Sequence, residues 1–132
     1  MAVSLGYRLN ILGFLSGKEL QADGDANAGL LDQRAAIEWV QRHISRFGGD
    51  PDTITIDGES AGGASVVMQV VAYGGENPPW QRDCEISVCC AGSKPVPFQR
   101  AIAQSIGYGP TATAEEAEEM FRKMMFTPDI VQ

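Results

Sequence analysis

The 132-residue sequence predicts an α/β fold built on a parallel sheet. Three short runs rich in apolar or β-branched residues have the length of strands, at residues 2–7, 53–56 and 98–105. Stretches with helical length or helical periodicity follow each of them. Strands that alternate with helices are typical of parallel sheets, because a parallel pair needs a crossover connection. A composition of 44% hydrophobic and 20% charged residues is ordinary for a globular domain.

Local signals place the elements of the first half. Residues 2–7 form a mostly apolar run that indicates a buried strand, and the glycine-rich residues 10–29 indicate a connection. Residues 30–47 predict a helix that ends at Gly48. Its apolar face consists of Leu30, Ile37, Val40, Ile44 and Phe47, and the polar residues that fall elsewhere are Asp32, Arg34, Glu38, Gln41 and Arg42.

The second half carries two more strands and two more helices. Residues 53–56 are β-branched at every position, which predicts a strand, and the apolar residues 64–72 have helical length. Residues 98–105 predict a turn followed by a strand. A last helix begins near Thr113, because Thr113 and Glu116 have the spacing of a capping box ahead of an acidic first turn.

Charge and apolar patterning argue against nucleic-acid binding and against a membrane-spanning helix. Ten basic and seventeen acidic residues give a net charge of −7, which disfavours nucleic acid because phosphate binding needs a basic surface. No apolar run reaches the roughly 18 residues of a transmembrane helix. The start of the chain indicates a strand and not a signal peptide.

A nucleophile-elbow motif, G-x-S-x-G, occupies residues 58–62 between a predicted strand and a predicted helix. A serine on a tight, strained turn projects its hydroxyl away from the backbone, and Gly58 and Gly62 let strand and helix approach closely. The amide of the following residue, Ala61, opens the helix and can face a developing oxyanion. The alternative is a glycine-rich strand–helix turn that needs only small residues.

Several ordered segments make the chain resemble the type-B carboxylesterase, lipase and cholinesterase family of α/β-hydrolases. They are YRL (7–9), LGFL (12–15), NAGLLDQR (27–34), WVQ (39–41), FGGDP (47–51) and GESAGGAS (58–65). Phe98 and residues 100–102 and 104–105 resemble the family's next strand. The resemblance implies a partial α/β-hydrolase fold, with three parallel strands, intervening helices and an incomplete sheet.

The resemblance also implies roles for individual residues. Ser60 corresponds to the acylated nucleophile, the Ala61 N–H to an oxyanion donor, and Glu59 to a residue that lines the site. Ser105 corresponds to a serine near the family's catalytic acid, and Arg8 and Asp32 to a buried ion pair that joins strand to helix. For Glu59 a solvated turn carboxylate is the alternative, and for Ser105 a strand-end hydroxyl that bonds backbone. The resemblance implies no metal and no organic cofactor.

The residues that would complete the catalytic machinery are not recognisable. The only histidine, His43, precedes Ser60, whereas the family order is serine, acid, histidine, so we expect His43 to be a surface helix residue. Asp83 and Asp129 follow Ser60 but match no family context, and the upstream His-Gly-Gly-type oxyanion loop is absent. We therefore expect residues 1–132 to be a fragment of one catalytic domain that neither hydrolyses esters efficiently nor folds stably alone.

Residues 76–92 depart from the family and contain all three cysteines, Cys84, Cys89 and Cys90. The codons for Gly75-Glu76 can contain a GTGAG splice donor, and those for Ala91-Gly92 can contain an AG splice acceptor. Excision between these two sites preserves the reading frame and leaves one glycine at the junction. We interpret this segment as a retained intron, with a genuine surface insertion as the alternative. Three thiols without a neighbouring histidine make a poor zinc site. An odd number of cysteines cannot all pair in disulfides within the chain, so these residues do not indicate whether the protein is in an oxidising or a reducing compartment.

The sequence thus predicts a serine carboxylic-ester hydrolase that acts on a small-molecule or lipid ester through an acyl-enzyme on Ser60. The rival is a non-catalytic, cholinesterase-like module that binds protein. Neither acyl preference, oligomeric state nor compartment is encoded in recognisable motifs, although full-length members of the family are often secreted.

Overall fold

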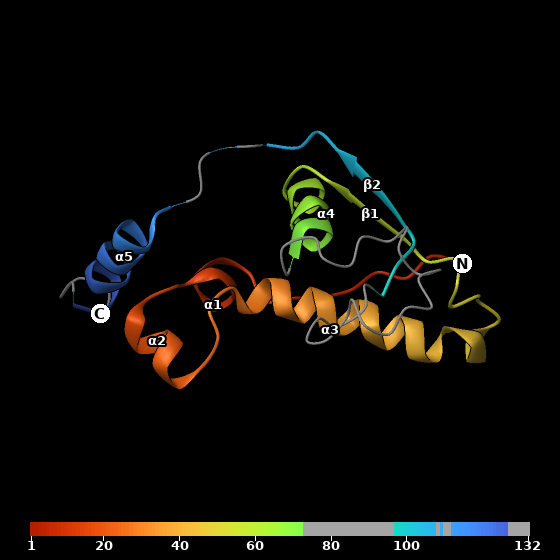
Figure 1. The fold of residues 1–132 in the computed structure, drawn as a ribbon, viewed down its shortest axis with the longest axis horizontal. Helices are drawn as coiled ribbons and strands as arrows, with labels where there is room; N and C mark the ends of the chain where they lie inside the picture. The colour runs from red at the N-terminus through yellow and green to blue at the C-terminus, as the bar shows by residue number, and fades with distance from the viewer. Residues whose placement is uncertain (73–96, 108, 110–111, 127–132) are drawn as a thin grey trace, which may run out of the picture. The chain divides into compact units, whose positions relative to one another are not determined.

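The computed structural model describes residues 1–72, 97–107, 109 and 112–126 (Figure 1). The chain divides into two compact units. The first comprises Met1–Leu5 and Arg34–Tyr108, and the second comprises Gly6–Gln33 and Gly109–Gln132.

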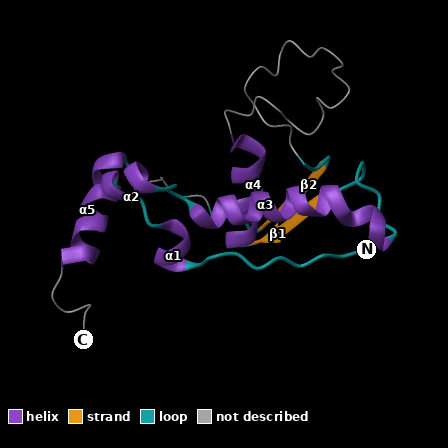
Figure 2. Cartoon of the chain, turned by 90° about the horizontal axis from the view of Figure 1, so that it is seen from below, coloured by secondary structure: helices purple, strands orange, loops and turns teal. Residues whose placement is uncertain are grey.

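The first unit contains a two-stranded parallel sheet. Strand β1 (Thr55–Glu59) pairs in parallel with β2 (Arg100–Gln104), in a register that sets Thr55 opposite Arg100 and Glu59 opposite Gln104. Helix α4 (Ala61–Val71) follows β1 directly and packs against both strands (Figure 2). A parallel pair with a helix in its crossover confirms the predicted α/β fold class.

The core of this unit lies between the sheet and its helices. Phe98 is fully buried and packs with Ile37, which is 6% exposed. Ile54, Ile56 and Val70 pack against this pair from the strand region and from α4. Removal of these side chains from water supplies the main stabilising free energy, at about 25 cal/mol per Å² of apolar surface.

Strand β1 is displaced from its predicted bounds because pairing, and not intrinsic propensity, sets them, whereas β2 (Arg100–Gln104) lies within the residues 98–105 predicted to form a turn and a strand. The prediction began β1 at residue 53 and ended it at residue 56, whereas the observed strand extends through Asp57, Gly58 and Glu59. These residue types have low strand propensity. They are extended because each faces a partner in β2, from Ile102 to Gln104.

The strand predicted at residues 2–7 is not formed. Val3 is 51% exposed and Leu5 is 37% exposed, and the segment has no strand assignment. A strand is stable only when a neighbour accepts and donates its backbone hydrogen bonds. The only strand pair within the described part of the chain is β1–β2, which leaves this run without a partner. Of the three expected strands, the described residues form two, β1 and β2.

Helix α3 (Ala28–His43) is longer at its start than predicted, and the boundary between the units falls within it. The 3-10 turn η1 (Ile44–Phe47) continues it to Gly48, whose φ of 80° provides the predicted left-handed stop. Ile44 is buried as expected, but Phe47 is 59% exposed. Arg34, assigned to the polar side, is in fact 5% exposed, and its guanidinium atoms Nε and Nη1 are themselves buried.

The second unit contains two helices in the stretch predicted to be only a connection, residues 10–29. These are α1 (Asn10–Phe14) and α2 (Lys18–Asp23), both too short to show a periodic pattern. Helix α5 (Ala114–Phe126) confirms the last predicted helix. The Glu116 N–H donates to Thr113 Oγ1 at 3.2 Å, and the Thr113 N–H donates to Glu116 Oε2 at 2.8 Å, so the capping box is formed.

Helix α5 is anchored within its unit by Phe121, which is 5% exposed. A Cβ added to Gly17 would lie 2.6 Å from Phe121 Cγ, so only glycine lets the backbone approach this ring. The Lys18 N–H also donates to Glu118 Oε2 at 2.8 Å, which fixes the start of α2 against α5.

Residues 76–92, with the three cysteines and Asp83, lie outside the described residues, as does Asp129. Among the described helices, none has the length and apolar character needed to cross a bilayer.

Candidate active site at the turn between β1 and α4

Ser60 lies on the turn that connects β1 to α4, in a conformation that few side chains adopt. Its φ is 54° and its ψ is −118°, and it directly precedes the first residue of α4. A non-glycine residue in this region is strained by about 1–3 kcal/mol, and such strain concentrates at functional sites. Ser60 is exposed, so the turn presents the serine at the surface of the described structure.

The sharp turn depends on close backbone contacts that exclude side chains. A Cβ on Gly58 would overlap the carbonyl of Gly62. A Cβ on Gly63 would lie 2.5 Å from the Gln104 carbonyl oxygen. Gly62 itself would accept a Cβ without meeting any atom within 4 Å. The steric requirement predicted for Gly62 thus falls on Gly63, because residue 63, and not residue 62, faces β2.

Ala61 is the first residue of α4, so its amide lies at the positive end of a helix dipole. The first hydrogen bond of the helix runs from the Ala64 N–H to the Ser60 carbonyl at 3.0 Å. Amides of a first helical turn lack an intrahelical acceptor, and this makes helix N-termini suitable for binding anions. The position of Ala61 therefore suits an oxyanion donor next to Ser60.

Two further predicted residues lie at the same edge of the sheet. Glu59 ends β1 and is exposed, and Ser105 follows the last residue of β2 with a φ of 49°. Because Glu59 and Gln104 are paired in parallel strands, Ser60 and Ser105 leave the sheet at the same end. The structure thus brings Glu59, Ser60, Ala61 and Ser105 together at the carboxyl ends of β1 and β2, where ligands bind in α/β sheets.

Sequence reasoning missed Gln104 and Gly63 as parts of this turn. The Ser60 N–H donates to the Gln104 carbonyl at 2.9 Å, and Gly63 approaches the same carbonyl. The glycine that directly follows the G-x-S-x-G motif was a visible signal for Gly63. No local signal pointed to Gln104, because its place depends on the strand register.

Arg8 and Asp32 belong to the second unit and form the ion pair that the resemblance implies. Arg8 Nε and Nη2 donate to the two carboxylate oxygens at 2.7 Å and 2.6 Å, and the Arg8 backbone N–H adds a bond at 3.0 Å. These bonds lower the pKa of Asp32 to about 2. The resemblance implied a buried pair, and this is wrong: the Arg8 side chain is 57% exposed and the Asp32 side chain is 27% exposed.

His43 lies at the end of α3 and contacts aromatic rings. Its ring centroid lies 4.9 Å from that of Trp39, and Trp39 is 6.3 Å from Phe47. His43 is partly exposed, and Trp39 is 47% exposed. No group of three acidic, histidine or cysteine side chains among the described residues could hold a metal ion.

Known proteins resemble this chain along most of its length. Carboxylesterase patB of Aspergillus clavatus is 55% identical over 59% of this chain and 14% of its own length. Lipase 2 of Geotrichum candidum is 39% identical over 91% of this chain and 23% of its own. The crystal structure of Aspergillus niger EstA covers 94% of this chain and 21% of its own, with a TM-score of 0.74 and 37% identity.

A thermophilic PNB esterase structure is 34% identical with a TM-score of 0.68, covering 90% of this chain and 20% of its own. The chain spans less than a quarter of the length of these relatives. The carboxylesterase family model matches residues 1–126. This match covers nearly the whole chain, which therefore belongs to the carboxylesterase family.

Proposed function

We propose that this chain carries the nucleophile of a serine carboxylic-ester hydrolase, and that Ser60 is that nucleophile. The observation that carries the proposal is the strained backbone of Ser60, with φ at 54°, on the turn between β1 and α4. If the turn required only small residues, glycine at this position would avoid the backbone strain, so a strained serine indicates a functional role. The carboxylesterase and lipase relatives support ester hydrolysis as the reaction class.

In the proposed reaction the Ser60 hydroxyl oxygen attacks the ester carbonyl carbon. The carbonyl oxygen becomes an oxyanion, which the Ala61 N–H and the dipole of α4 stabilise. Collapse of this intermediate breaks the bond to the alcohol, which leaves with a proton, and the acyl group stays on Ser60. Water then attacks the acyl-enzyme and releases the carboxylic acid.

A general base must take the Ser60 proton, and His43 is a poor candidate because its ring contacts Trp39 within α3 and it precedes Ser60 in the chain. We propose that the catalytic histidine, the acid that orients it and further oxyanion amides come from the regions of the full-length family members that this chain does not span. We call the chain together with that part the full-length protein. Its substrates are small-molecule or lipid esters.

A fluorophosphonate probe tests the proposal on the full-length protein. We expect stoichiometric labelling that Ser60→Ala abolishes and Ser45→Ala leaves unchanged, because Ser45 is an exposed serine of η1. Mass spectrometry of the labelled peptide locates the phosphonate. Absence of labelling at Ser60 in a folded protein would overturn the proposal and favour the non-catalytic, protein-binding alternative.

A further inference from the structure

Gln104, the last residue of β2, supports the turn at Ser60 through its main chain. Its carbonyl oxygen accepts the Ser60 N–H at 2.9 Å. The same oxygen would lie 2.5 Å from a Cβ on Gly63, so the first turn of α4 approaches it closely. One peptide group of β2 therefore contacts the chain both at the strained serine and three residues beyond it.

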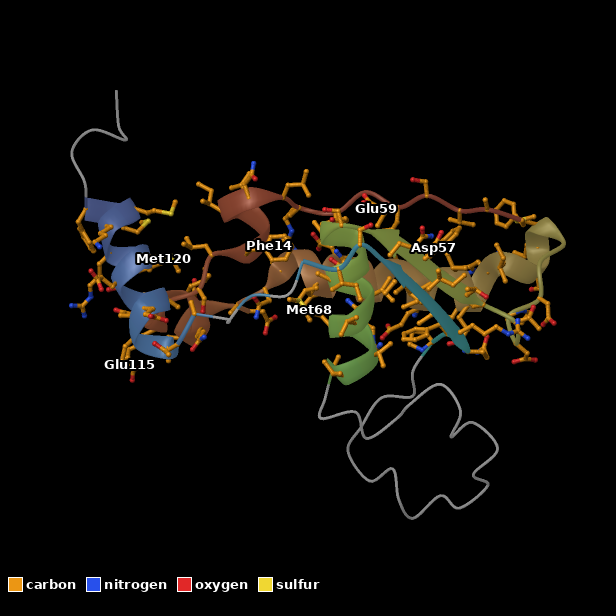
Figure 3. All side chains as sticks on the ribbon, turned by 90° about the horizontal axis from the view of Figure 1, so that it is seen from above. Phe14, Asp57, Glu59, Met68, Glu115 and Met120 are labelled. Carbon is orange, nitrogen blue, oxygen red and sulfur yellow. The ribbon has the colours of Figure 1, made fainter. Side chains whose placement is uncertain are left out.

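The side chain of Gln104 reaches back to β1. Its Nε2 donates to Asp57 Oδ1 at 3.4 Å, a diagonal contact, since Asp57 is paired with Ile102 and Gln104 with Glu59. Asp57 and Glu59 occupy alternate, exposed positions of β1, and both are labelled in Figure 3. Gly58 between them faces α4, so the two carboxylates and the Gln104 amide occupy the opposite face of the sheet.

This arrangement sets a neutral donor beside two acids of like charge. Carboxylates two residues apart on one face of a strand repel each other. An amide donor opposite one and diagonal to the other can bind an acid without adding charge. A third carboxylate at position 104 would instead add repulsion directly beside Ser60.

We propose that Gln104, held by Asp57, is a positioning residue that keeps the Ser60 turn in its strained conformation. The Asp57 contact restrains the Gln104 side chain, and so limits movement of the residue whose carbonyl binds the Ser60 N–H. This inference rests on the proposed role of Ser60 as nucleophile. Loss of the contact slows attack by Ser60 and leaves substrate binding largely unchanged.

The test uses four variants of the full-length protein. Gln104→Glu replaces the donor with a carboxylate, and Gln104→Met removes it without charge. The double variant Asp57→Asn/Gln104→Glu exchanges donor and acceptor across the same pair. Arg100→Gln is the matched control, since it also changes the net charge by −1 on β2 but at the end of the strand away from Ser60.

The measurements are the rate constant of fluorophosphonate labelling, kcat and KM for 4-nitrophenyl acetate, and Tm. We expect Gln104→Glu to lower the labelling rate and kcat about tenfold with KM within about twofold, and Gln104→Met to show a smaller loss. The double variant recovers most of the rate, and Arg100→Gln behaves as the parent protein does.

A Gln104→Glu rate within about twofold of the parent rate would overturn the inference, as would an equal loss in Arg100→Gln. A fall in Tm and rate that the double variant does not recover would assign Gln104 a merely structural role, which also overturns it. A parent protein that is not labelled at Ser60 refutes the proposed function itself. This result is distinguishable from the outcomes that concern Gln104, because those require a parent protein that is labelled.

Discussion

Gly63 in the first turn of α4 touches the backbone of Gln104 so closely that only a hydrogen atom fits between them. A Cβ at position 63 would lie 2.5 Å from the Gln104 carbonyl oxygen and 3.2 Å from its nitrogen. The neighbouring Gly62 has no atom within 4 Å of the corresponding point. These two adjacent glycines therefore offer a comparison in which sequence context is shared and only the contact differs.

We predict opposite effects for Gly63→Ala and Gly62→Ala in the full-length protein. Gly63→Ala pushes α4 away from β2 and lowers the free energy of unfolding by about 1–3 kcal/mol, the usual cost of overpacking. Gly62→Ala adds a helix-favouring residue in open space and changes it by less than about 1 kcal/mol in the stabilising direction. Urea denaturation measures both, and equal effects would show that α4 does not approach β2 in solution.

The strain at Ser60 predicts that glycine is more stable there than alanine. Both Ser60→Gly and Ser60→Ala remove the hydroxyl, but only alanine keeps a Cβ at a φ of 54°. Relief of about 1–3 kcal/mol of strain exceeds the roughly 0.5–1 kcal/mol that glycine loses through chain entropy. We expect Ser60→Gly to unfold with a free energy about 1 kcal/mol above that of Ser60→Ala.

Chemical denaturation of the two variants, neither of which reacts with the probe, provides the comparison. Ser45→Gly and Ser45→Ala form the matched control, because Ser45 has no positive φ. At position 45 alanine should be the more stable of the two. The same order at both positions would mean that the Ser60 turn relaxes in solution.

The parts of the structure that sequence predicted correctly have local causes. The capping box at Thr113 and the left-handed stop at Gly48 each need only a few neighbouring residues. The turn at Ser60 was predictable because strand, small residues and helix follow one another directly. The wrong predictions concern residues whose state depends on distant partners. Residues 2–7 pair with no strand in the described part of the chain, and Asp57, Gly58 and Glu59 are extended because β2 lies beside them.

The ion pair between Arg8 and Asp32 predicts a stability that depends on pH in acid. Hydrogen bonds from the guanidinium and the Arg8 N–H lower the pKa of Asp32 to about 2, from an ordinary value of 3.8. A carboxylate whose folded pKa is depressed stabilises the fold above its unfolded pKa. This contribution is lost as the pH falls through the folded pKa. The stabilisation is therefore complete above about pH 5 and decreases towards pH 2.

Comparison of the parent protein with Asp32→Asn isolates this contribution. We expect the difference between their urea midpoints to be constant from pH 7 to about pH 5 and to shrink as the pH approaches 2. Asp25→Asn, at an exposed position of the same unit, is the control. Because Arg8 is 57% exposed, 1 M NaCl should reduce the difference at pH 7. A difference that grows in acid would contradict the assignment.

Residues 76–92, we propose, are translated from a retained intron. The codons of Gly75-Glu76 and Ala91-Gly92 accommodate a splice donor and an acceptor. Excision between them removes 17 codons, or 51 nucleotides, and joins Gly74 to Ser93 through a single glycine. Reverse transcription and amplification across this region should yield a mature message shorter by that length.

Mass spectrometry of the native protein is the second measurement, and it should detect a peptide that spans the joined flanks and none from within 76–92. A mature message that retains these codons, together with a peptide that contains Cys84, would establish a genuine insertion. The two outcomes also predict different numbers of cysteine thiols in the native protein, because all three cysteines of the sequence lie in this segment. A native protein without it contains no cysteine between residues 1 and 132, so thiol-directed reagents would not modify this part of the chain.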